Sequence, residues 1–280
     1  MLVDFHVHST ASDGTLAPAE IARQAKDFAA IALTDHDNCD GIAEWSGVAG
    51  VELSIEPGRG FDRFHLLGLG IDSGNPALKA FLRRILEGRN ERNARIIANF
   101  ARLGIDLGSE IGAYAHGEVL ARPHFAAWLV KHGRAKSIAE AFEKYLLPTS
   151  PKATRCYEER YHPSQSESFE VVHAAGGLAV MAHPKYWRDD WRERGADYLA
   201  AEAELRRLKD LGLDGIEALY HANTVEENIG FTHLADRVGL LKTAGSDFHG
   251  ANKPEIPLGM EVSEKFIAPF LARISTAFSR

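Results

Sequence analysis

The sequence has few cysteines, no long apolar run and no excess of positive charge. Only Cys39 and Cys156 occur among 280 residues, which excludes a disulfide framework and predicts a reducing, cytoplasmic setting. No apolar stretch reaches the roughly 20 residues that a membrane-spanning helix needs. The first ten residues lack the basic and apolar segments of a signal peptide. The sequence therefore predicts no membrane partner.

The formal net charge is −7 with histidine neutral. Binding to duplex nucleic acid needs a basic surface, so no duplex partner is expected. A small phosphorylated substrate is compatible with this charge, because bound metal ions can reverse it locally. The 13 histidines are many for a chain of this length, and their positions are the main source of functional information.

Short apolar runs alternate with helical patterns along most of the chain. The expected strands are Leu2–His8, Ala30–Thr34, Val51–Ile55, Phe64–Gly68, Leu178–Ala182, Gly215–Leu219 and Leu240–Ala244. The expected helices between them are Pro18–Phe28, Glu167–Ala175, Asp197–Leu211 and Thr224–Val238. This alternation predicts a parallel α/β architecture, and about seven strands favour a barrel over a short open sheet.

The alternation stops between about Pro76 and Pro163, where only helical spacing is found. The pattern predicts an all-helical insertion. Its first helix carries five arginines, at positions 83, 84, 89, 92 and 95. They could form an anion-binding stripe, but a solvated helix face with local ion pairs is the favoured interpretation.

Two histidines, His6 and His8, stand two residues apart at the end of the first expected strand. Residues i and i+2 of a strand point to the same side, so both imidazoles can bind one metal ion. Such a pair is a weak signal by itself. Asp13, in the triplet Ser12-Asp13-Gly14, is by itself typical of a turn.

Most expected strands carry a histidine or a carboxylate at or near their carboxyl end. The further residues of this kind are His36, Glu52, His65, His183, Asp247 and His249. Each alone is explained by a core or loop role, but a chance scatter would not follow the strand ends. Because active sites of (β/α) barrels are built at the carboxyl ends of the strands, the pattern predicts that these side chains converge.

The predicted ligand set has nine members: His6, His8, Asp13, His36, Glu52, His65, His183, Asp247 and His249. Nine ligands exceed the four of one tetrahedral zinc ion and fit two or three divalent ions bridged by a carboxylate. Mixed imidazole and carboxylate ligands favour manganese, iron or zinc over calcium or magnesium. Ligand type does not choose among the first three metals.

These motifs resemble the PHP (polymerase and histidinol phosphatase) family of metal-dependent phosphoesterases. The matching segments are His6-Val7-His8-Ser9-Thr10, Ser12-Asp13-Gly14-Thr15, Thr34-Asp35-His36-Asp37, Gly50-Val51-Glu52-Leu53-Ser54, His65-Leu66-Leu67-Gly68, Ala182-His183-Pro184 and Gly245-Ser246-Asp247-Phe248-His249-Gly250. The resemblance covers most of the chain in the family's order. It is strongest to the nucleoside 3′,5′-bisphosphate phosphatase branch, which has a helical insertion. Between Asp37 and Glu52 the chain is shorter than the family pattern.

The resemblance implies a distorted, TIM-like (β/α)7 barrel formed by residues 1–75 and 164–280, with a helical cap at 76–163. It also implies a trinuclear, usually manganese, site. One ion would be held by His6, His8, Glu52 and Asp247. Glu52 would bridge to a second ion, held by His65 and His183, and the third would be held by Asp13, His36 and His249. A water that bridges the ions would attack phosphorus as hydroxide.

Three further residues are expected to act at the substrate phosphate. Arg122 and His124 lie in Arg122-Pro123-His124, which resembles a family motif and opens an expected helix. A helix N-terminus binds phosphate through free N–H groups, and a guanidinium fits phosphate oxygens; the alternative for Arg122 is a solvated residue at a helix start. His221 follows an expected strand and resembles a family position near the phosphate.

The implied function is hydrolysis of a nucleotide phosphomonoester, with a nucleoside 3′,5′-bisphosphate giving the 5′-monophosphate and phosphate. A 5′-3′ exoribonuclease or oligonucleotide phosphoesterase, a histidinol-phosphate phosphatase and a barrel amidohydrolase are alternatives. A non-catalytic metal-binding module is disfavoured because all nine ligand positions are present. The sequence leaves the physiological metal, the preferred nucleotide, the leaving-group acid and the oligomeric state open.

Overall fold

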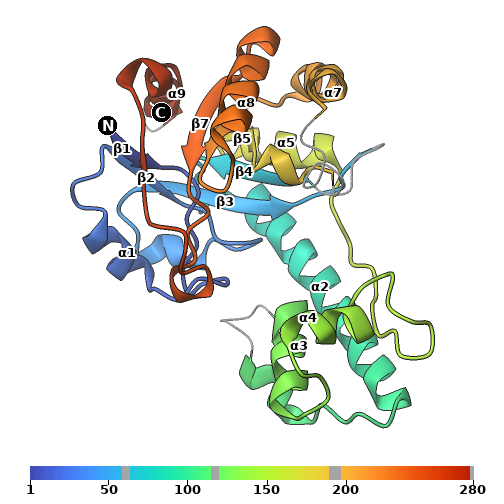
Figure 1. Cartoon of the computed structure of the whole chain (residues 1–280). Coiled ribbons are helices and arrows are strands. Elements are labelled where there is room, and N and C mark those ends of the chain that lie inside the picture. The colour runs from blue at the N-terminus through green and yellow to red at the C-terminus, as the bar shows by residue number, and fades with distance from the viewer. Residues whose placement is uncertain (59–63, 115–119, 189–196, 278–280) are drawn as a thin grey trace. The chain divides into compact units, whose positions relative to one another are not determined.

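The computed structural model describes residues 1–58, 64–114, 120–188 and 197–277 (Figure 1). The chain divides into two compact units. The barrel unit comprises Met1–Leu82 and His162–Arg280, and the helical unit comprises Arg83–Tyr161. The limits of an insertion at residues 76–163 stay a prediction.

One eight-stranded sheet forms the barrel unit, in the order β7-β6-β5-β4-β3-β2-β1-β8. The strands are β1 (Leu2–Asp4), β2 (Ala30–Leu33), β3 (Val48–Ser54), β4 (His65–Leu69), β5 (Leu178–Met181), β6 (Gly215–Tyr220), β7 (Leu241–Gly245) and β8 (Met260–Glu261). The segments after β1 and β7 also meet, because Phe5 N donates to Ala244 O and Asp247 N donates to His6 O, both at 2.9 Å. The sheet is therefore a nearly closed barrel, which confirms the predicted fold class.

Strand β4 runs antiparallel to both of its neighbours, β3 and β5, so the expectation of a uniformly parallel sheet is wrong at this position. The connection between β3 and β4 is too short for the helical crossover that parallel neighbours need. Ser54, the last residue of β3, pairs with His65, the first residue of β4. The reversal therefore brings the start of β4, rather than its end, to the edge where the neighbouring strands finish.

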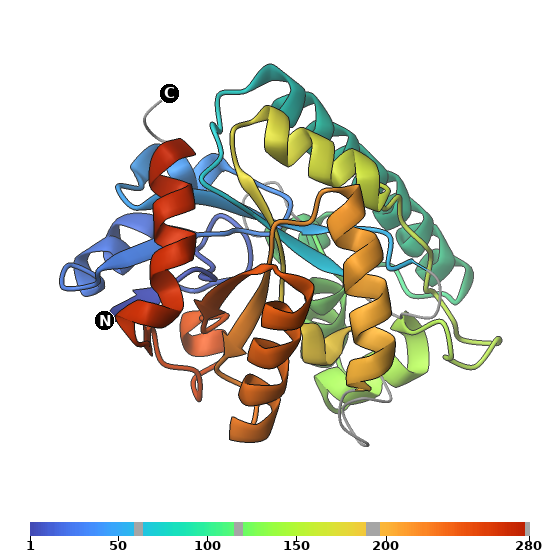
Figure 2. The ribbon, with the colours of Figure 1, turned by 90° about the horizontal axis from the view of Figure 1, so that it is seen from above.

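Helices cover the outside of the barrel unit: α1 (Pro18–Gln24), α5 (Gln165–Ala174), α7 (Tyr198–Leu211), α8 (Val225–Val238) and α9 (Glu264–Ala277). Figure 2 shows α5, α7, α8 and α9 around the strands. The ends of α8 are set locally. Thr224 Oγ1 accepts from Glu227 N at 3.2 Å, Glu227 Oε2 accepts from Thr224 N at 2.8 Å, and Gly239 ends the helix at φ 71°.

Several short elements complete the barrel unit. The shortened connection before Glu52 holds a 3-10 helix, Asp40–Glu44, and β3 starts at Val48, earlier than expected. Two more 3-10 turns, Pro184–Tyr186 and Gly250–Asn252, follow β5 and β7. Strand β8 and helix α9 were not predicted. Helix α9 closes the barrel core, where Phe270 meets Phe5 edge-on at 4.8 Å between ring centroids.

The helical unit has its own core. Helix α2 (Pro76–Arg102) is followed by η2 (Ser109–Tyr114), α3 (Arg122–Lys131), α4 (Ile138–Ala141) and a π-helical turn, η3 (Phe142–Leu146). Phe100 of α2 packs against Phe125 and Tyr145, with ring centroids 6.4 and 5.5 Å away. None of the helices that the structure describes is both long and apolar enough to cross a membrane.

The arginines of α2 differ in exposure. Arg83, Arg84 and Arg95 are exposed, whereas Arg89 and Arg92 are buried. The expectation of a fully solvated face is therefore wrong for the last two. A segment that ends the helical unit covers this part of α2, since a Cβ at Gly88 would lie 2.6 Å from Tyr161 Cβ.

Candidate metal centre

His6 and His8 lie on the extended segment after β1, and both are fully buried. Backbone hydrogen bonds fix this segment on both sides. Val7 N donates to Thr34 Oγ1 at 3.0 Å, and His8 N donates to Phe248 O at 2.9 Å. The two imidazoles consequently share one side of the chain, as the spacing predicted.

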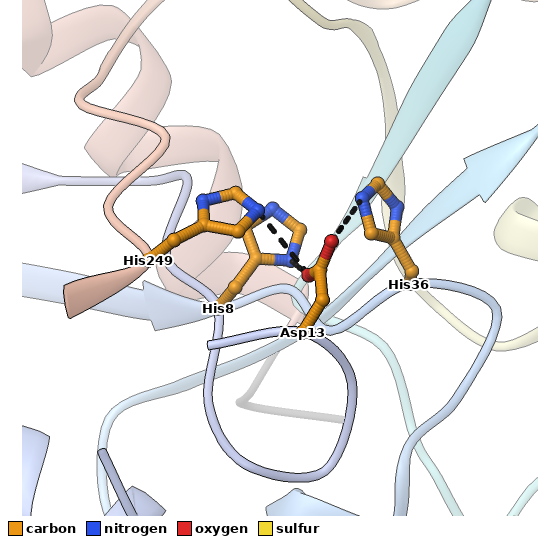
Figure 3. Close-up of side chains that lie close together, drawn as sticks. All are labelled: His8, Asp13, His36 and His249. Carbon is orange, nitrogen blue, oxygen red and sulfur yellow. Dashed lines mark ion pairs between the residues drawn. The ribbon is translucent and has the colours of Figure 1, made fainter. Parts of the chain in front are cut away.

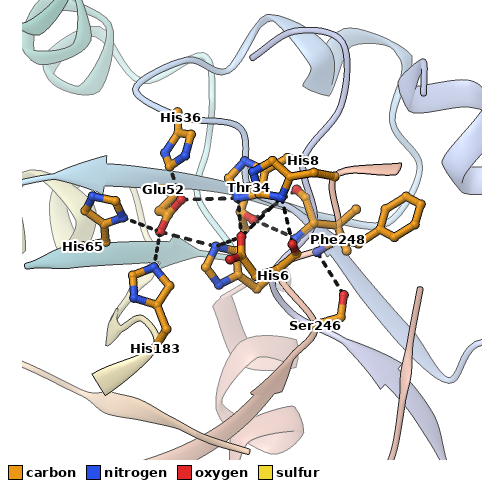
Figure 4. A network of polar contacts seen from close by, with 12 residues as sticks. His6, His8, Thr34, His36, Glu52, His65, His183, Ser246 and Phe248 are labelled. Atoms are coloured by element: carbon orange, nitrogen blue, oxygen red, sulfur yellow. Dashed lines mark hydrogen bonds and ion pairs between the residues drawn. The ribbon is translucent and has the colours of Figure 1, made fainter. Parts of the chain in front are cut away.

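Glu52 of β3 lies at the middle of the cluster and is fully buried (Figure 4). Five imidazoles surround its carboxylate, with N···O distances of 3.3 Å (His6), 3.3 Å (His8), 2.9 Å (His36), 2.9 Å (His65) and 3.0 Å (His183). Ligand atoms that share one ion at about 2.1 Å lie about 3.0–3.4 Å apart. The spacing around Glu52 fits a carboxylate that bridges metal ions.

A second group consists of His8, Asp13, His36 and His249 (Figure 3). Asp13 Oδ1 lies 3.2 Å from His249 Nε2 and 3.7 Å from His8 Nδ1, and Asp13 Oδ2 lies 3.8 Å from His36 Nε2. The other ring nitrogens of His8 and His36 face Glu52. These two rings therefore connect the two groups into one centre.

Asp247 joins the same centre from the end of β7. Its Oδ1 lies 3.3 Å from His8 Nε2, 3.4 Å from His249 Nδ1 and 3.6 Å from His6 Nε2. Its Oδ2 accepts hydrogen bonds from Tyr220 Oη at 3.0 Å and Lys253 Nζ at 2.6 Å. One carboxylate oxygen thus faces the imidazoles while the other is held by two donors. With Asp247, all nine predicted ligand residues converge.

The chemistry of the donor atoms fits divalent ions. Among the described residues, four buried atoms of the centre lack a hydrogen-bond partner: His6 Nε2, His8 Nε2, His36 Nδ1 and Glu52 Oε2. Leaving a buried polar group without a partner costs about 1–3 kcal/mol. Ligand atoms of His6, His8 and Glu52 lie within 4.8 Å of one another, as do those of His36, Glu52 and His65. Ions bound here would satisfy these atoms.

Opposite charges dominate the electrostatics of the centre. Burial alone would lower the pKa of His6, but the carboxylates of Glu52, Glu217 and Asp247 raise it well above its ordinary value. Burial would raise the pKa of Glu52, but the surrounding imidazoles hold it well below its usual range. Glu52 is therefore ionised. Protons on the imidazoles would compete with metal ions, so metal binding releases protons.

Two of the converging residues have an unusual backbone conformation. Among the described non-glycine residues, positive φ occurs at Asp37 (51°), His183 (25°) and Asp247 (61°). Residues with a side chain rarely adopt a positive φ, because the Cβ atom clashes with the backbone. Non-glycine residues with a positive φ concentrate at functional sites. The left-handed turns redirect the chain at the ends of β5 and β7, where these ligands are needed.

Sequence reasoning missed Glu217 of β6, which lies behind the ligands. It is fully buried; its Oε1 accepts from His6 Nδ1 at 3.0 Å, and its Oε2 accepts from His183 N at 2.6 Å. A partner of this kind fixes the orientation and the tautomer of a metal-binding histidine. The available signal was a charged residue inside the apolar strand Gly215–Tyr220.

Buried aspartates fix the loops that carry the ligands. Asp4 accepts from the backbone of His6, Ser246 and Gly259 and from Ser246 Oγ, at 2.6–3.2 Å. Asp35 accepts from Ser9 N at 2.8 Å and from Ser9 Oγ at 2.7 Å. These carboxylates satisfy backbone donors rather than face the imidazoles, so they have positioning roles.

The three residues expected at the phosphate lie outside this cluster. Arg122 is half-buried at the start of α3 in the helical unit. His124 is buried, and its Nδ1 accepts from Ala121 N at 2.9 Å, so the neutral ring carries its proton on Nε2. His221 is exposed at the end of β6. Their roles at a phosphate stay a prediction.

Comparison with proteins of assigned function gives relatives over most of the chain. A 3′,5′-nucleoside bisphosphate phosphatase of Chromobacterium violaceum is 36% identical over 261 residues, which are 88% of this chain and 87% of that protein. The 5′-3′ exoribonuclease Rnm of Escherichia coli is 31% identical over 89% of this chain and 85% of that protein. A phosphoribosyl 1,2-cyclic phosphate 1,2-diphosphodiesterase of Eggerthella lenta is 29% identical over 89% of this chain and 95% of that protein.

Solved structures share the whole fold. A Chromobacterium violaceum structure, described as an amidohydrolase with bound sulfate and no metal, has a TM-score of 0.78 and 33% identity, and covers 97% of this chain and 96% of that one. A proposed metal-dependent phosphoesterase of Bifidobacterium adolescentis has a TM-score of 0.76, 26% identity and the same coverage. No protein-family model matches the chain. With relatives of this identity and coverage, the chain belongs to the PHP-type metal-dependent phosphoesterases, which are hydrolases of phosphoric esters.

Proposed function

We propose that the chain hydrolyses a nucleotide phosphomonoester, and that its substrate is a nucleoside 3′,5′-bisphosphate, which gives the 5′-monophosphate and phosphate. The observation that supports this most is the carboxylate of Glu52, buried among five imidazoles at 2.9–3.3 Å. The 36% identical relative acts, by its name, on this substrate class.

In this proposal, the nine converging residues hold divalent ions, three in number and manganese by preference, with iron or zinc as alternatives. His6, His8, Glu52 and Asp247 would hold one ion, and Glu52 with His65 and His183 a second. Asp13, His36 and His249 would hold the third. Such ions lower the pKa of a coordinated water and neutralise charge on phosphate oxygens.

The chain's own residues prepare the site in several ways. Burial of His6, His8 and Glu52 limits the access of bulk water, which strengthens charge interactions with a phosphate. Burial also lowers the pKa of His65 and of His249, which favours the neutral imidazole that binds metal ions.

We assign substrate contacts to three further residues. Arg122 presents a planar guanidinium to phosphate oxygens. His124 would donate from Nε2–H, because its Nδ1 accepts a hydrogen bond from Ala121 N. His221 would neutralise phosphate charge or donate a proton to the leaving oxygen.

A second function is supported by the relatives that are 5′-3′ exoribonucleases at 30–31% identity. A protein of that kind removes nucleotides from an oligonucleotide, so its turnover would persist on longer chains. The net charge of −7 favours a small substrate over a long polyanion.

A substrate panel tests the proposal. The protein is reconstituted with manganese, and the hydrolysis products are separated and quantified by chromatography for adenosine 3′,5′-bisphosphate, mononucleotides, histidinol phosphate, short oligonucleotides, a cyclic phosphate and an amide. We expect the highest kcat/KM on the bisphosphate, with loss of activity and of bound metal in His8→Ala and Asp247→Ala. Preference for oligonucleotides or for the amide would replace the proposed substrate.

A further inference from the structure

Lys253 is a lysine in direct contact with the metal centre. Its Nζ donates to Asp247 Oδ2 at 2.6 Å, the oxygen that does not face the imidazoles. Within the part of the chain that the structure describes, no other lysine or arginine pairs with any of the nine converging residues. A phosphate ester is negatively charged, so a cation in this position is suited to contact a substrate.

The backbone of Lys253 is held in place by its own loop. Lys253 N donates to Gly250 O at 3.1 Å, which closes a turn. The turn packs closely on the chain before α1, because a Cβ at Gly250 would lie 2.2 Å from Thr15 Oγ1. It is also attached to the segment of Asp13, since Asn252 Nδ2 donates to Asp13 O at 2.7 Å. The lysine side chain therefore starts from a fixed position beside the centre.

The metal centre is open to solvent on the side where this loop lies. Five of the nine ligand residues are buried, and four are partly exposed: Asp13, His36, His65 and His183. Asp13 has the most exposed side chain of the four, and it is the residue to which the Lys253 loop is attached. A phosphate that comes from solvent approaches over the exposed ligands, and Lys253 lies at their edge.

The ammonium group of Lys253 has more donors than Asp247 uses. A lysine has three N–H donors, and among the described residues Asp247 is the one partner of Nζ. The lysine side chain is 36% exposed, so the other donors can meet a ligand. Tyr220 differs, because its hydroxyl donates its single proton to the same Asp247 oxygen and the residue is only 4% exposed. Of the two groups that hold this oxygen, only the lysine can also bind an incoming anion.

We propose that Lys253 is a substrate-binding residue, which holds Asp247 with one N–H group and binds an oxygen of the substrate phosphate with another. Hydrogen bonds between charged groups are short and strong. A positive charge fixed beside the phosphate stabilises the negative charge on its oxygens during hydrolysis. The assignment rests on the part of the proposed function that places phosphate hydrolysis at this centre, and not on the identity of the nucleotide.

Binding of inorganic phosphate tests the contact directly. Manganese-loaded protein, freed of excess metal, is titrated calorimetrically with inorganic phosphate. We expect Lys253→Met to weaken phosphate binding about 10–100-fold. Lys253→Arg keeps a cationic donor and should bind phosphate more tightly than Lys253→Met. Wild-type phosphate affinity in Lys253→Met, or no phosphate binding by the wild-type protein, would overturn the proposal.

Two matched variants separate direct contact from an effect through Asp247. Tyr220→Phe removes the other donor to the same oxygen without a loss of charge, and should change phosphate affinity less than about 5-fold. Lys242→Met removes a lysine that pairs with Asp236 near the opposite end of β7, and should change it less than about 2-fold. If Tyr220→Phe weakens phosphate binding as much as Lys253→Met does, the lysine acts through Asp247 and the proposal is wrong.

Metal binding and folding are measured on the same variants. Competition with a fluorescent chelator gives the manganese affinity, which should fall by a smaller factor than the phosphate affinity in Lys253→Met. Equal factors would assign the lysine to metal binding alone and contradict the proposal. Because the side chain is partly exposed, the melting temperature should stay close to that of the wild type. Lys253→Gln carries the same test if Lys253→Met does not fold.

Kinetics on adenosine 3′,5′-bisphosphate distinguish failure of this proposal from failure of the proposed function. If phosphate binding depends on Lys253 but the wild type does not hydrolyse the bisphosphate, the proposed substrate is wrong and the role of Lys253 stands. If the wild type hydrolyses the bisphosphate and Lys253→Met keeps the wild-type kcat/KM, the role of Lys253 is wrong and the proposed function stands.

Discussion

Glu217 offers the sharpest test of how the barrel orients its ligands. Both of its carboxylate oxygens are used, Oε1 by His6 Nδ1 at 3.0 Å and Oε2 by the backbone N of His183 at 2.6 Å. In Glu217→Gln the amide keeps only one acceptor oxygen, so one of these two donors would face an NH2 group. The substitution changes shape very little, and its effect therefore reports the loss of an acceptor.

The magnitude follows from the role of such partners. Removal of a group that orients a metal-binding histidine costs about 10–100-fold in metal affinity, or about 1.4–2.7 kcal/mol. We expect Glu217→Gln to weaken manganese binding by this factor, as measured by competition with a fluorescent chelator. Glu170→Gln, on the exposed face of α5, is the control and should bind manganese like the wild type. Wild-type affinity in Glu217→Gln would refute the orienting role.

Two other substitutions probe the barrel unit. Gly245→Ala would place a Cβ 2.1 Å from Glu217 Oε1 and 2.5 Å from His6 Cβ; we expect a loss of about 1–3 kcal/mol in urea unfolding and weaker metal binding, and an unchanged midpoint would contradict this. His173 Nε2 lies 2.8 Å from Asp214 Oδ2, and this hydrogen bond raises the pKa of His173. Stabilisation by a raised histidine pKa is complete below the unfolded value and is lost as pH rises through the folded value. His173→Gln should therefore lower the free energy of unfolding more at pH 5.5 than at pH 9. The loss should stay below about 1 kcal/mol because the pair is partly exposed, and an equal loss at both pH values would argue against the pair.

The barrel and its cluster were largely predictable because their signals are local. Apolar runs mark the strands, and His6 with His8 shows the strand period directly. The direction of a strand depends on its partners, so the reversal of β4 was not visible in the sequence. His65 nevertheless reaches the cluster, because the start of an antiparallel strand lies where its parallel neighbours end.

Burial of charged residues was the harder part to predict. Glu217 stands in an apolar strand, yet nothing local says that its oxygens meet His6 and a backbone N–H. Arg92 has the spacing of an ordinary solvated helix face, yet the folded chain leaves it only 4% exposed. Both cases depend on contacts between residues far apart in the chain.

The most direct test of the account is the metal content of Glu52→Gln beside that of the wild type. The carboxylate meets five imidazoles, and its loss removes the carboxylate that the proposed ligand sets of two ions share. After manganese loading and removal of excess metal, elemental analysis should find more than one ion per wild-type chain. The variant should hold less, with phosphate release abolished. Wild-type metal content in Glu52→Gln, or full activity of a metal-free wild type, would contradict a carboxylate-bridged metal centre.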